Sequence, residues 1–343
     1  MTEPAAGLIG CGVMGRRHAA ALMALEKEGR LRFAGIYDPR PEGYEALKRE
    51  APGAPPFFDD LEAFYAAIRP ETLAIATTAP HHLPHLEAAA AHGVKRALVE
   101  KPLAVSTVEV RRIVALDAAG LRIAVNHQWP FFPAYARLKD LANGPALGGV
   151  VSASVMGGAF GAAMGGSHAI FLFEWMSGAR LARASAWFDA EPLPNPRGAE
   201  FVDRAGEMRF EAEDGRALHV NCRAEQRHGQ LEVWNCRLGQ IVVDRLTWTA
   251  LIRHRREEDR EAPATRYGMP GVSESLTLDA MDLVAASGDH MAALIEGAGY
   301  VGAADGARVV ELLSAAHLSA ERGGAPVAAP LGEADAARSF PWC

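Results

Sequence analysis

The chain has 343 residues, of which 49% are hydrophobic and 22% are charged, a composition typical of a water-soluble globular protein. The formal net charge of −7 gives no reason to expect binding to nucleic acid or to an anionic membrane. No apolar run approaches the ~20 residues of a membrane span, and the length suggests two domains.

The N-terminus and the cysteines indicate in which cellular compartment the protein is expected. The chain enters its first apolar run almost at once, which leaves no room for a signal peptide. The cysteines show neither C-x-x-C pairing nor a metal-ligand spacing, so we expect reduced thiols in a cytoplasmic protein. They are Cys11, Cys222, Cys236 and Cys343. For Cys11, which lies in a glycine-rich loop, a small structural side chain is favoured over a redox role.

That glycine-rich loop organises the chain. Leu8 and Ile9 end a short apolar run that is typical of a buried parallel strand. Gly10, Gly12 and Gly15 then follow with the spacing G-x-G-x-x-G. The first glycine permits a tight turn, the second lets a pyrophosphate approach the backbone, and the third lets the next helix pack near the strand.

The residues after the loop strengthen this interpretation. The helix predicted over 13–28 points its free N–H groups and its positive dipole end at the phosphates, so Val13 and Met14 are candidate cofactor contacts. The next strand, predicted over 31–37, ends at Asp38.

A carboxylate at the position of Asp38 can accept hydrogen bonds from both hydroxyls of the adenosine ribose, and it would repel a 2′-phosphate. NAD is therefore favoured over NADP, although Arg40 softens the preference and keeps NADP open. The simpler interpretation is an ordinary glycine-rich turn followed by a surface aspartate. The order of strand, glycines, helix, strand and acid favours the nucleotide.

Residues 1–125 alternate predicted strands and helices. Further strands are expected at 72–77, 94–99 and 122–125, and further helices at 41–50, 60–68, 86–92 and 107–119. Ser106 and Glu109 form a capping-box pattern at the start of the last helix. Repeated units of this length predict a doubly wound parallel sheet.

Such sheets bind ligands beyond the carboxyl ends of their strands. Gly10, Thr77, Lys101 and Asn126 all follow predicted strands. We therefore expect these residues to face one crevice.

The pattern changes after about residue 126, so residues 126–343 are predicted to form a second α/β domain. Helices are expected at 133–143, 276–297 and 306–319, and strands at 150–155, 181–188, 208–213, 217–225, 230–237 and 240–248. Asp214-Gly215 is a hairpin signal, and the strands around it predict an open, mostly antiparallel sheet with one buried face. The charged run 253–261 is interpreted as a solvated edge or loop.

Together these motifs resemble those of the Gfo/Idh/MocA family, which is named for glucose–fructose oxidoreductase, inositol dehydrogenase and a rhizopine-catabolism protein. The resemblance covers almost the whole chain and is most specific at the glycine loop and at Glu100-Lys101-Pro102-Leu103-Ala104. Further matching positions are Asp38, Thr77, His82, Asn126-His127-Gln128, Phe131, Pro133, Gly165-Gly166-Ser167-His168, Trp175, Gly178 and Asp305-Gly306.

The resemblance implies a Rossmann domain joined to an α/β domain with an open sheet, through which family members assemble as dimers or tetramers. It also implies hydride transfer between NAD(P) and a carbon of a sugar, sugar nucleotide, cyclitol or related molecule. Lys101 and His168 are then the catalytic candidates, and Glu100 orients Lys101 or the cofactor. Thr77, His82 and Asn126 become candidate cofactor contacts.

Lys101 also has a physical argument of its own. It follows a buried strand at the predicted crevice, where partial desolvation would lower the pKa of its ammonium group. Such a lysine can donate a hydrogen bond to a substrate oxygen or relay its proton, and Pro102, with a peptide bond that is a candidate for the cis form, would aim it. The alternative is a surface lysine before a turn-forming proline.

His168 has an ordinary pKa suited to general-base chemistry near neutrality. In the oxidation direction it would accept the hydroxyl proton while the hydride leaves the same carbon. A structural histidine at a helix start is the alternative. The cluster of His81, His82 and His85 suggests a metal, but no carboxylate or cysteine stands at a suitable spacing, so no metal is predicted.

The chain departs from the family pattern around the expected substrate pocket. Met164 stands where many members carry an aspartate four residues before the histidine, and Phe171 stands where an acid is frequent. Arginines are frequent at the positions of Trp129 and Pro130. The candidate substrate contacts are therefore Lys101, Gln128, Trp129, Met164 and His168, with Phe131, Phe132 and Phe171 as further candidates for an apolar lining.

Two other functions remain open on the same fold. One is a nucleotide-binding sensor or assembly protein without turnover, which is suggested by Met164 at the position of the usual aspartate. Transient use of NAD for elimination or epimerisation is the other alternative. The leading interpretation is an NAD(P)-dependent oxidoreductase that acts on CH–OH groups of a polyol-like substrate.

Overall fold

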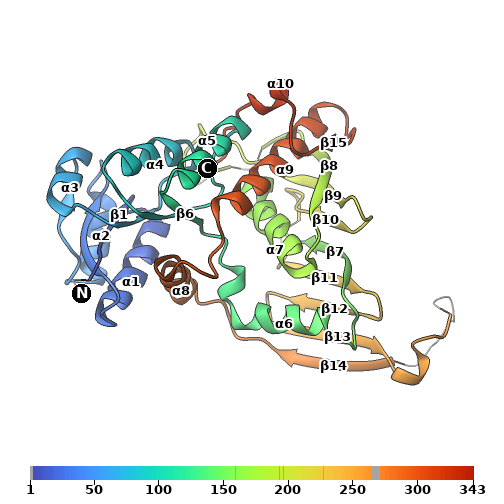
Figure 1. The fold of residues 1–343 in the computed structure, drawn as a ribbon. Coiled ribbons are helices and arrows are strands. Elements are labelled where there is room, and N and C mark those ends of the chain that lie inside the picture. The colour runs from blue at the N-terminus through green and yellow to red at the C-terminus, as the bar shows by residue number, and fades with distance from the viewer. Residues whose placement is uncertain (1–2, 159, 193, 196, 227, 264–270) are drawn as a thin grey trace. The chain divides into compact units, whose positions relative to one another are not determined.

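The computed structural model describes residues 3–158, 160–192, 194–195, 197–226, 228–263 and 271–343. The chain divides into two compact units (Figure 1). The first contains Met1–Phe131, Asp282–Val310 and Cys343, and the second contains Phe132–Met281 and Glu311–Trp342.

A parallel sheet of six strands forms the centre of the first unit, in the order β3-β2-β1-β4-β5-β6. The bounds are β1 Ala5–Ile9, β2 Arg32–Tyr37, β3 Phe57–Phe58, β4 Thr72–Ile75, β5 Arg96–Val99 and β6 Arg122–Val125. Strand order reverses between β1 and β4, which is where a doubly wound sheet binds its ligand. The predicted doubly wound parallel sheet is confirmed.

Helices cover both faces of this sheet, with α4 and α5 together on one face and α1 and α8 on the other (Figure 1). The bounds are α1 Val13–Lys27, α2 Glu42–Glu50, α3 Leu61–Ile68, α4 His82–Ala91, α5 Thr107–Ala118 and α8 Leu283–Glu296, with short 3₁₀ turns at Ala79–His81 and Trp129–Phe131. Leu8, Leu22 and Met291 belong to one buried apolar cluster, which ties α8 to α1 and β1.

The packing of α8 against α1 brings Asp282–Val310 into the first unit, so the division of the chain differs from the single boundary expected near residue 125. The helix expected over 276–297 is also shorter. The Asp282 carboxylate accepts the N–H groups of Val284 at 3.0 Å and Ala285 at 2.9 Å. This N-cap sets the start of α8, and residues before it belong to a strand or a connection.

The second unit is built on a sheet of nine strands in the order β14-β13-β12-β11-β7-β10-β9-β8-β15. The bounds are β7 Val150–Met156, β8 Leu181–Phe188, β9 Gly206–Ala212, β10 Ala217–Asn221, β11 Leu231–Cys236, β12 Gly239–Asp244, β13 Thr249–Arg255, β14 Gly271–Thr277 and β15 Val327–Ala328. Among the described residues of this sheet, only β7 and β10 pair in parallel, so the predicted open and mostly antiparallel sheet is confirmed.

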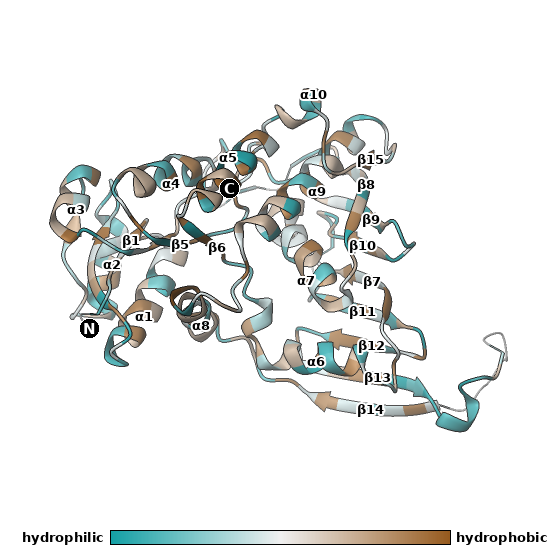
Figure 2. Cartoon of the chain, in the orientation of Figure 1, coloured by the Kyte–Doolittle hydropathy of each residue, from teal (hydrophilic) through white to brown (hydrophobic). Residues whose placement is uncertain are grey.

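The strand expected over 240–248 is shorter in the structure, where β12 ends at Asp244 and residues 245–248 form a turn before β13. The carboxylate of Asp244 accepts the N–H of Leu246 at 2.8 Å and so forms the turn between β12 and β13. The first residues of the charged run 253–261 lie in β13, and the segment that follows this strand is hydrophilic (Figure 2).

The second unit also contains helices and short helical turns. The α-helices are α6 Pro133–Asn143, α7 Ser167–Ser177 and α10 Glu333–Ala336. A π-helical turn lies at Gly161–Gly166 and a 3₁₀ turn at Glu257–Asp259. Helix α9 Ala303–Glu321 contributes residues to both units. Helix α7 contacts β7 and β10, and Phe173 stacks on Trp234 with ring centroids 6.5 Å apart. No helix among the described residues is long and apolar enough to cross a bilayer.

Candidate active site

The glycine loop joins β1 to α1, and packing explains two of its three glycines. Gly10 has φ +89°, and a Cβ there would lie 2.9 Å from the carbonyl carbon of Ala76. A Cβ at Gly15 would overlap the carbonyl oxygen of Gly10. At Gly12, in contrast, a Cβ would have no atom within 4 Å from the described residues beyond its immediate chain neighbours. Packing within the protein therefore does not require glycine at position 12.

The Asp38 carboxylate holds the loop from the end of β2. Its Oδ2 accepts the N–H of Cys11 at 2.8 Å and its Oδ1 accepts the N–H of Arg40 at 3.0 Å. Each oxygen keeps a second lone pair, so the carboxylate can still accept hydrogen bonds from a ligand. Helix α2 approaches the loop so closely that a Cβ at Gly43 would overlap the Cys11 carbonyl oxygen.

Burial and the neighbouring Asp38 raise the pKa of the Cys11 thiol to about 11. The thiol is fully buried and stays protonated near neutral pH. It therefore lacks the thiolate character of a redox-active cysteine, in agreement with the structural role favoured by the sequence.

The N-terminus of α1 is open to solvent. Its N-cap is Gly12, no side chain among the described residues caps it, and its first turn contains no acidic residue. Val13 is 64% exposed, and Met14 is half-buried with its sulfur 3.3 Å from Nη1 of Arg17. An uncapped helix N-terminus without a nearby acid is suited to an anionic group.

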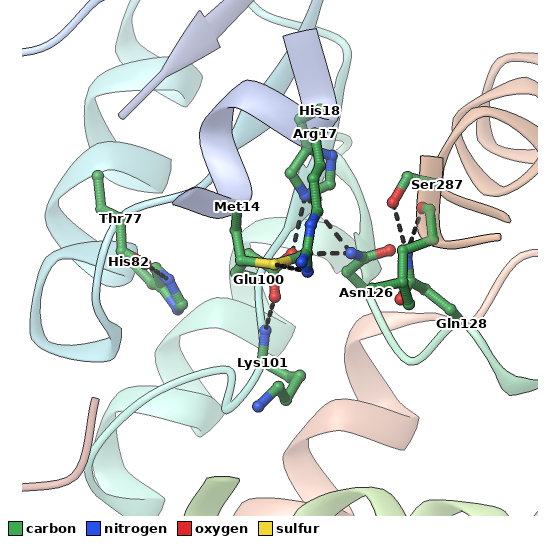
Figure 3. A network of polar contacts seen from close by, with 11 residues as sticks. Met14, Arg17, His18, Thr77, His82, Glu100, Lys101, Asn126, Gln128 and Ser287 are labelled. Carbon is green, nitrogen blue, oxygen red and sulfur yellow. Dashed lines mark hydrogen bonds and ion pairs between the residues drawn. The ribbon is translucent and has the colours of Figure 1, made fainter. Parts of the chain in front are cut away.

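A buried polar network connects the ends of β5 and β6 with α1 (Figure 3). Oε1 of Glu100 accepts hydrogen bonds from Nε2 of His18 at 2.8 Å and from Nδ2 of Asn126 at 2.8 Å. Burial of the Glu100 carboxyl opposes its ionisation. The hydrogen bond and attraction from His18, the charge of Lys101 and the Asn126 amide outweigh burial and lower the pKa of Glu100 to about 2.

Lys101 follows this network directly. Its backbone N–H donates to Oε2 of Glu100 at 3.2 Å, and its side chain is half-buried (Figure 3). The Lys101–Pro102 peptide bond is cis, as the sequence suggested. Glu100 thus fixes the backbone from which the Lys101 side chain extends.

The structure brings Thr77 beside the glycine loop, where its Cγ2 would lie 3.1 Å from a Cβ at Gly10. His82 is fully buried, and its two ring nitrogens lie 3.1 Å from the carbonyl oxygens of Thr77 and Leu103. Burial lowers the pKa of His82. His82 therefore joins the loop after β4 to the loop after β5, and both of its ring nitrogens face backbone carbonyls.

The residues that follow β6 contact helix α8. Nε2 of Gln128 donates to the carbonyl oxygen of Leu283 at 2.9 Å and to Oγ of Ser287 at 2.6 Å (Figure 3). Trp129 is only 4% exposed, and the Phe131 ring stacks on His290 at 4.6 Å.

In the second unit, Met164 lies in the π-helical turn and His168 is the second residue of α7. Both side chains are half-buried. The aromatic side chains of Phe132 and Phe171 are buried, like that of Trp129. Of the proposed apolar lining, Phe131 and Met164 are therefore the residues with the most solvent-accessible side chains.

Sequence reasoning missed His18, Ser287 and Gly43. His18 lies on the buried face of α1 with Gly15 and Leu22, so a polar residue in an apolar helix stripe was the available signal. Nothing local marks Ser287 or Gly43, because each meets its partner only after distant segments pack together. No cluster of three or more His, Cys, Asp or Glu side chains suited to a metal occurs in the described part of the chain.

Residues 5–127 match the model of the oxidoreductase family with an NAD-binding Rossmann fold. The chain is also similar to inositol 2-dehydrogenase from Burkholderia multivorans, with 31% identity over 144 residues. The matched stretch covers 41% of this chain and 42% of that relative, so it spans less than half of the relative's length.

Solved structures of the same fold cover nearly the whole chain. UDP-N-acetylglucosamine 3-dehydrogenase from Acidithiobacillus ferrooxidans has a TM-score of 0.74 at 20% identity, over 94% of this chain and 99% of that one. The WlbA dehydrogenase from Bordetella pertussis, solved with NADH and UDP-GlcNAcA, has a TM-score of 0.72 at 19% identity, over 96% and 100%. Residues 5–127 therefore carry the NAD-binding Rossmann fold of the Gfo/Idh/MocA oxidoreductases.

Proposed function

We propose that this protein is an NAD(P)-dependent oxidoreductase that moves a hydride between the nicotinamide and a carbinol carbon of a sugar, sugar nucleotide, cyclitol or related substrate. The match of residues 5–127 to the NAD-binding oxidoreductase family model and the geometry of the glycine loop support this function. The relatives named above act on inositol and on UDP-N-acetylglucosamine, which supports a polyol-like substrate.

The glycine at position 12 carries the proposal. Packing accounts for Gly10 and Gly15, but in the part of the chain that the structure describes no atom beyond the neighbouring residues lies within 4 Å of a Cβ at Gly12. A missing side chain that no neighbour requires is explained when a ligand approaches the backbone there. The uncapped start of α1 follows Gly12 directly, and the Asp38 carboxylate accepts the N–H of Cys11, the residue before it. These two features complete a site for a dinucleotide.

The cofactor contacts in this proposal come from strand ends of the first unit. They are Gly10, Gly12, Val13, Met14, Gly15, Asp38, Arg40, Thr77, Glu100, Lys101 and Asn126. The buried Oδ1 of Asn126 accepts no hydrogen bond from the described residues, which supports including Asn126 in this set. His82 has a positioning role in this proposal, since its ring nitrogens face the carbonyl oxygens of Thr77 and Leu103.

The catalytic roles are assigned to Lys101 and His168. When bound, NAD supplies a nicotinamide carbon that accepts a hydride. The Lys101 ammonium donates a hydrogen bond to the substrate hydroxyl oxygen, and its backbone is fixed by Glu100. A ring nitrogen of His168 accepts the hydroxyl proton as the carbinol is oxidised.

Met164 and Trp129 are assigned to the substrate site. The side-chain NH₂ group of Gln128 has a structural role, because it donates hydrogen bonds to Leu283 and Ser287. In this proposal the amide oxygen of Gln128 contacts the substrate.

Gly12→Ala tests the nucleotide site. We expect the variant to fold with an unchanged melting temperature and to lose at least about tenfold in affinity for NADH, measured by fluorescence titration. Gly53→Ala is the matched control, because a Cβ at that position also meets nothing within 4 Å. Unchanged NADH affinity in Gly12→Ala, or no affinity of the wild type for NADH and NADPH, would overturn the proposal.

A measurement of turnover distinguishes the enzyme from the alternative that Met164 suggests, an NAD-binding sensor without catalytic activity. A screen of NADH absorbance across cyclitols, sugars and UDP-sugars should reveal a substrate. Tight NADH binding with no turnover on any of them, and no conversion by product analysis, would favour the sensor. The expected homodimer or homotetramer stays a prediction, which light scattering tests. The expected absence of nucleic-acid and membrane partners also stays a prediction.

A further inference from the structure

Helix α7, which carries His168, begins in an unusual way. The six residues Gly161–Gly166 form a π-helical turn, and α7 continues from it at Ser167. π-Helical turns are rare and are frequently found at functional sites. The orientation of the first turn of α7, and with it the direction of the His168 side chain, depends on what holds this segment.

The segment 203–204 supplies the acceptors for the first amides of the turn. Oδ1 of Asp203 accepts the N–H of Ala163 at 2.8 Å, and Oδ2 accepts the N–H of Met164 at 2.9 Å. The carbonyl oxygen of Arg204 accepts the N–H of Ala162 at 2.7 Å. Asp203 therefore acts as an N-cap from about 40 residues away in sequence.

This cap is rigid. Asp203 is 5% exposed, and the preceding Val202 donates its N–H to the carbonyl oxygen of Pro341 at 2.6 Å. Gly161 has φ +69°, and a Cβ there would overlap the Asp203 carboxylate. A Cβ at Gly165 would overlap the ring of Phe160. The glycines of the turn thus make room for the carboxylate and for the tight local packing.

We propose that Asp203 is a positioning residue for His168. Its carboxylate fixes the π-helical turn by two charge-assisted hydrogen bonds, and the turn sets the start of α7 and the orientation of the His168 imidazole. Asp203 is buried and both of its oxygens accept backbone amides of the turn, so in this proposal it acts through the helix. The proposal rests on the proposed function only in taking His168 as the proton acceptor.

The tests use the full-length protein and three variants. Asp203→Asn keeps one carbonyl acceptor and removes the charge, Asp203→Ala removes both acceptors, and Gly161→Ala displaces the carboxylate from the opposite side. Asp189→Asn is the matched control, because Oδ2 of Asp189 also accepts a backbone amide, that of Ala224 at 2.9 Å, in the same unit.

The readouts are hydrogen exchange of the Ala163 and Met164 amides, the NMR signals of the His168 ring, NADH affinity, and kcat with KM. In Asp203→Ala and Gly161→Ala we expect the two amides to exchange at least about tenfold faster and the His168 ring signals to shift. With a substrate in hand, kcat should fall by about tenfold to a hundredfold, because a displacement of about 1 Å can cost that much in rate. NADH affinity should stay within about threefold of the wild type.

Asp203→Asn should lie between the wild type and Asp203→Ala in each readout, and Asp189→Asn should match the wild type. Faster amide exchange with unchanged His168 signals and unchanged kcat would overturn the proposal, because Asp203 would then be structural only. A loss of kcat in equal proportion in Asp189→Asn would also overturn it. Failure of the wild type to bind NADH rejects the proposed function and leaves the exchange and histidine signals as an independent test of Asp203.

Discussion

The carboxylate of Glu100 accepts a hydrogen bond from His18 at 2.8 Å, and this contact joins the end of β5 to the helix that follows the glycine loop. The same oxygen accepts the Asn126 amide from the end of β6. One buried carboxylate therefore connects three segments that the sequence separates. Because the N–H of Lys101 donates to the other oxygen, the network also fixes the backbone of the catalytic candidate.

Replacing Glu100 with glutamine should disrupt this network. One amide oxygen cannot replace both carboxylate oxygens, and the new NH₂ group would face donors. We expect Glu100→Gln to lower the free energy of unfolding by about 1–3 kcal/mol and to weaken NADH binding by about tenfold. Denaturant unfolding and fluorescence titration measure the two effects. Glu62→Gln, at an exposed position of α3, is the control, and wild-type values for Glu100→Gln would contradict the prediction.

Asp38 should set the choice between NADH and NADPH. Its carboxylate would repel a 2′-phosphate and accept ribose hydroxyls, so Asp38→Ala should lower the preference for NADH by about tenfold to a hundredfold. The variant also loses the acceptor for the Cys11 N–H, which should weaken binding of both nucleotides. Dissociation constants for NADH and NADPH give the ratio. An unchanged ratio, or an equal change in the exposed control Asp59→Asn, would rule this role out.

Lys101 and His168 should affect the chemical step more than nucleotide binding. We expect Lys101→Met and His168→Gln each to lower kcat by a factor of about 10²–10⁴, the range that a positioned acid or base contributes. NADH affinity should change by less than about threefold for His168→Gln. Steady-state kinetics with the identified substrate measure the effect, and the exposed Lys95→Met serves as the control. A variant with wild-type kcat would remove its residue from the catalytic assignment.

His317 should make the second unit sensitive to acid. Burial lowers the pKa of this histidine to about 4, and its ring lies 4.8 Å from Phe188, 4.8 Å from Phe340 and 5.1 Å from Trp342. Below pH 6.5 the unfolded chain binds a proton that the folded His317 does not, so the unfolding free energy falls as the pH drops from 6.5 to 4, by up to about 1.4 kcal/mol per pH unit.

The variant His317→Gln should reduce this dependence. Between pH 7 and pH 5, its unfolding free energy should fall by roughly 2 kcal/mol less than that of the wild type. Urea unfolding at the two pH values measures the difference. His228→Gln replaces an exposed histidine and should leave the wild-type dependence unchanged. Equal losses in the wild type and in His317→Gln would mean that His317 does not contribute to acid sensitivity.

Local patterns predicted most of the fold. The doubly wound sheet, the open antiparallel sheet and the helix at Pro133–Asn143 follow from periodicity and turn residues, which act within a few positions of the chain. The predicted capping box at Ser106 is present on one side, since Ser106 accepts the N–H of Glu109 at 3.2 Å. The Glu109 carboxylate, however, accepts the N–H of Val105, one residue before the expected partner.

The glycine spacing, Asp38 and the Glu-Lys-Pro element predicted the NAD-binding Rossmann fold that the family model matches at residues 5–127, because these signals are short and local. Only the tertiary structure decided that Glu100 joins His18 to Asn126, and that Asp203 caps the turn before His168. These contacts connect residues that lie between 26 and 82 positions apart. A buried polar group takes whichever partner packing brings within hydrogen-bond distance, and that choice is made only when distant segments come together.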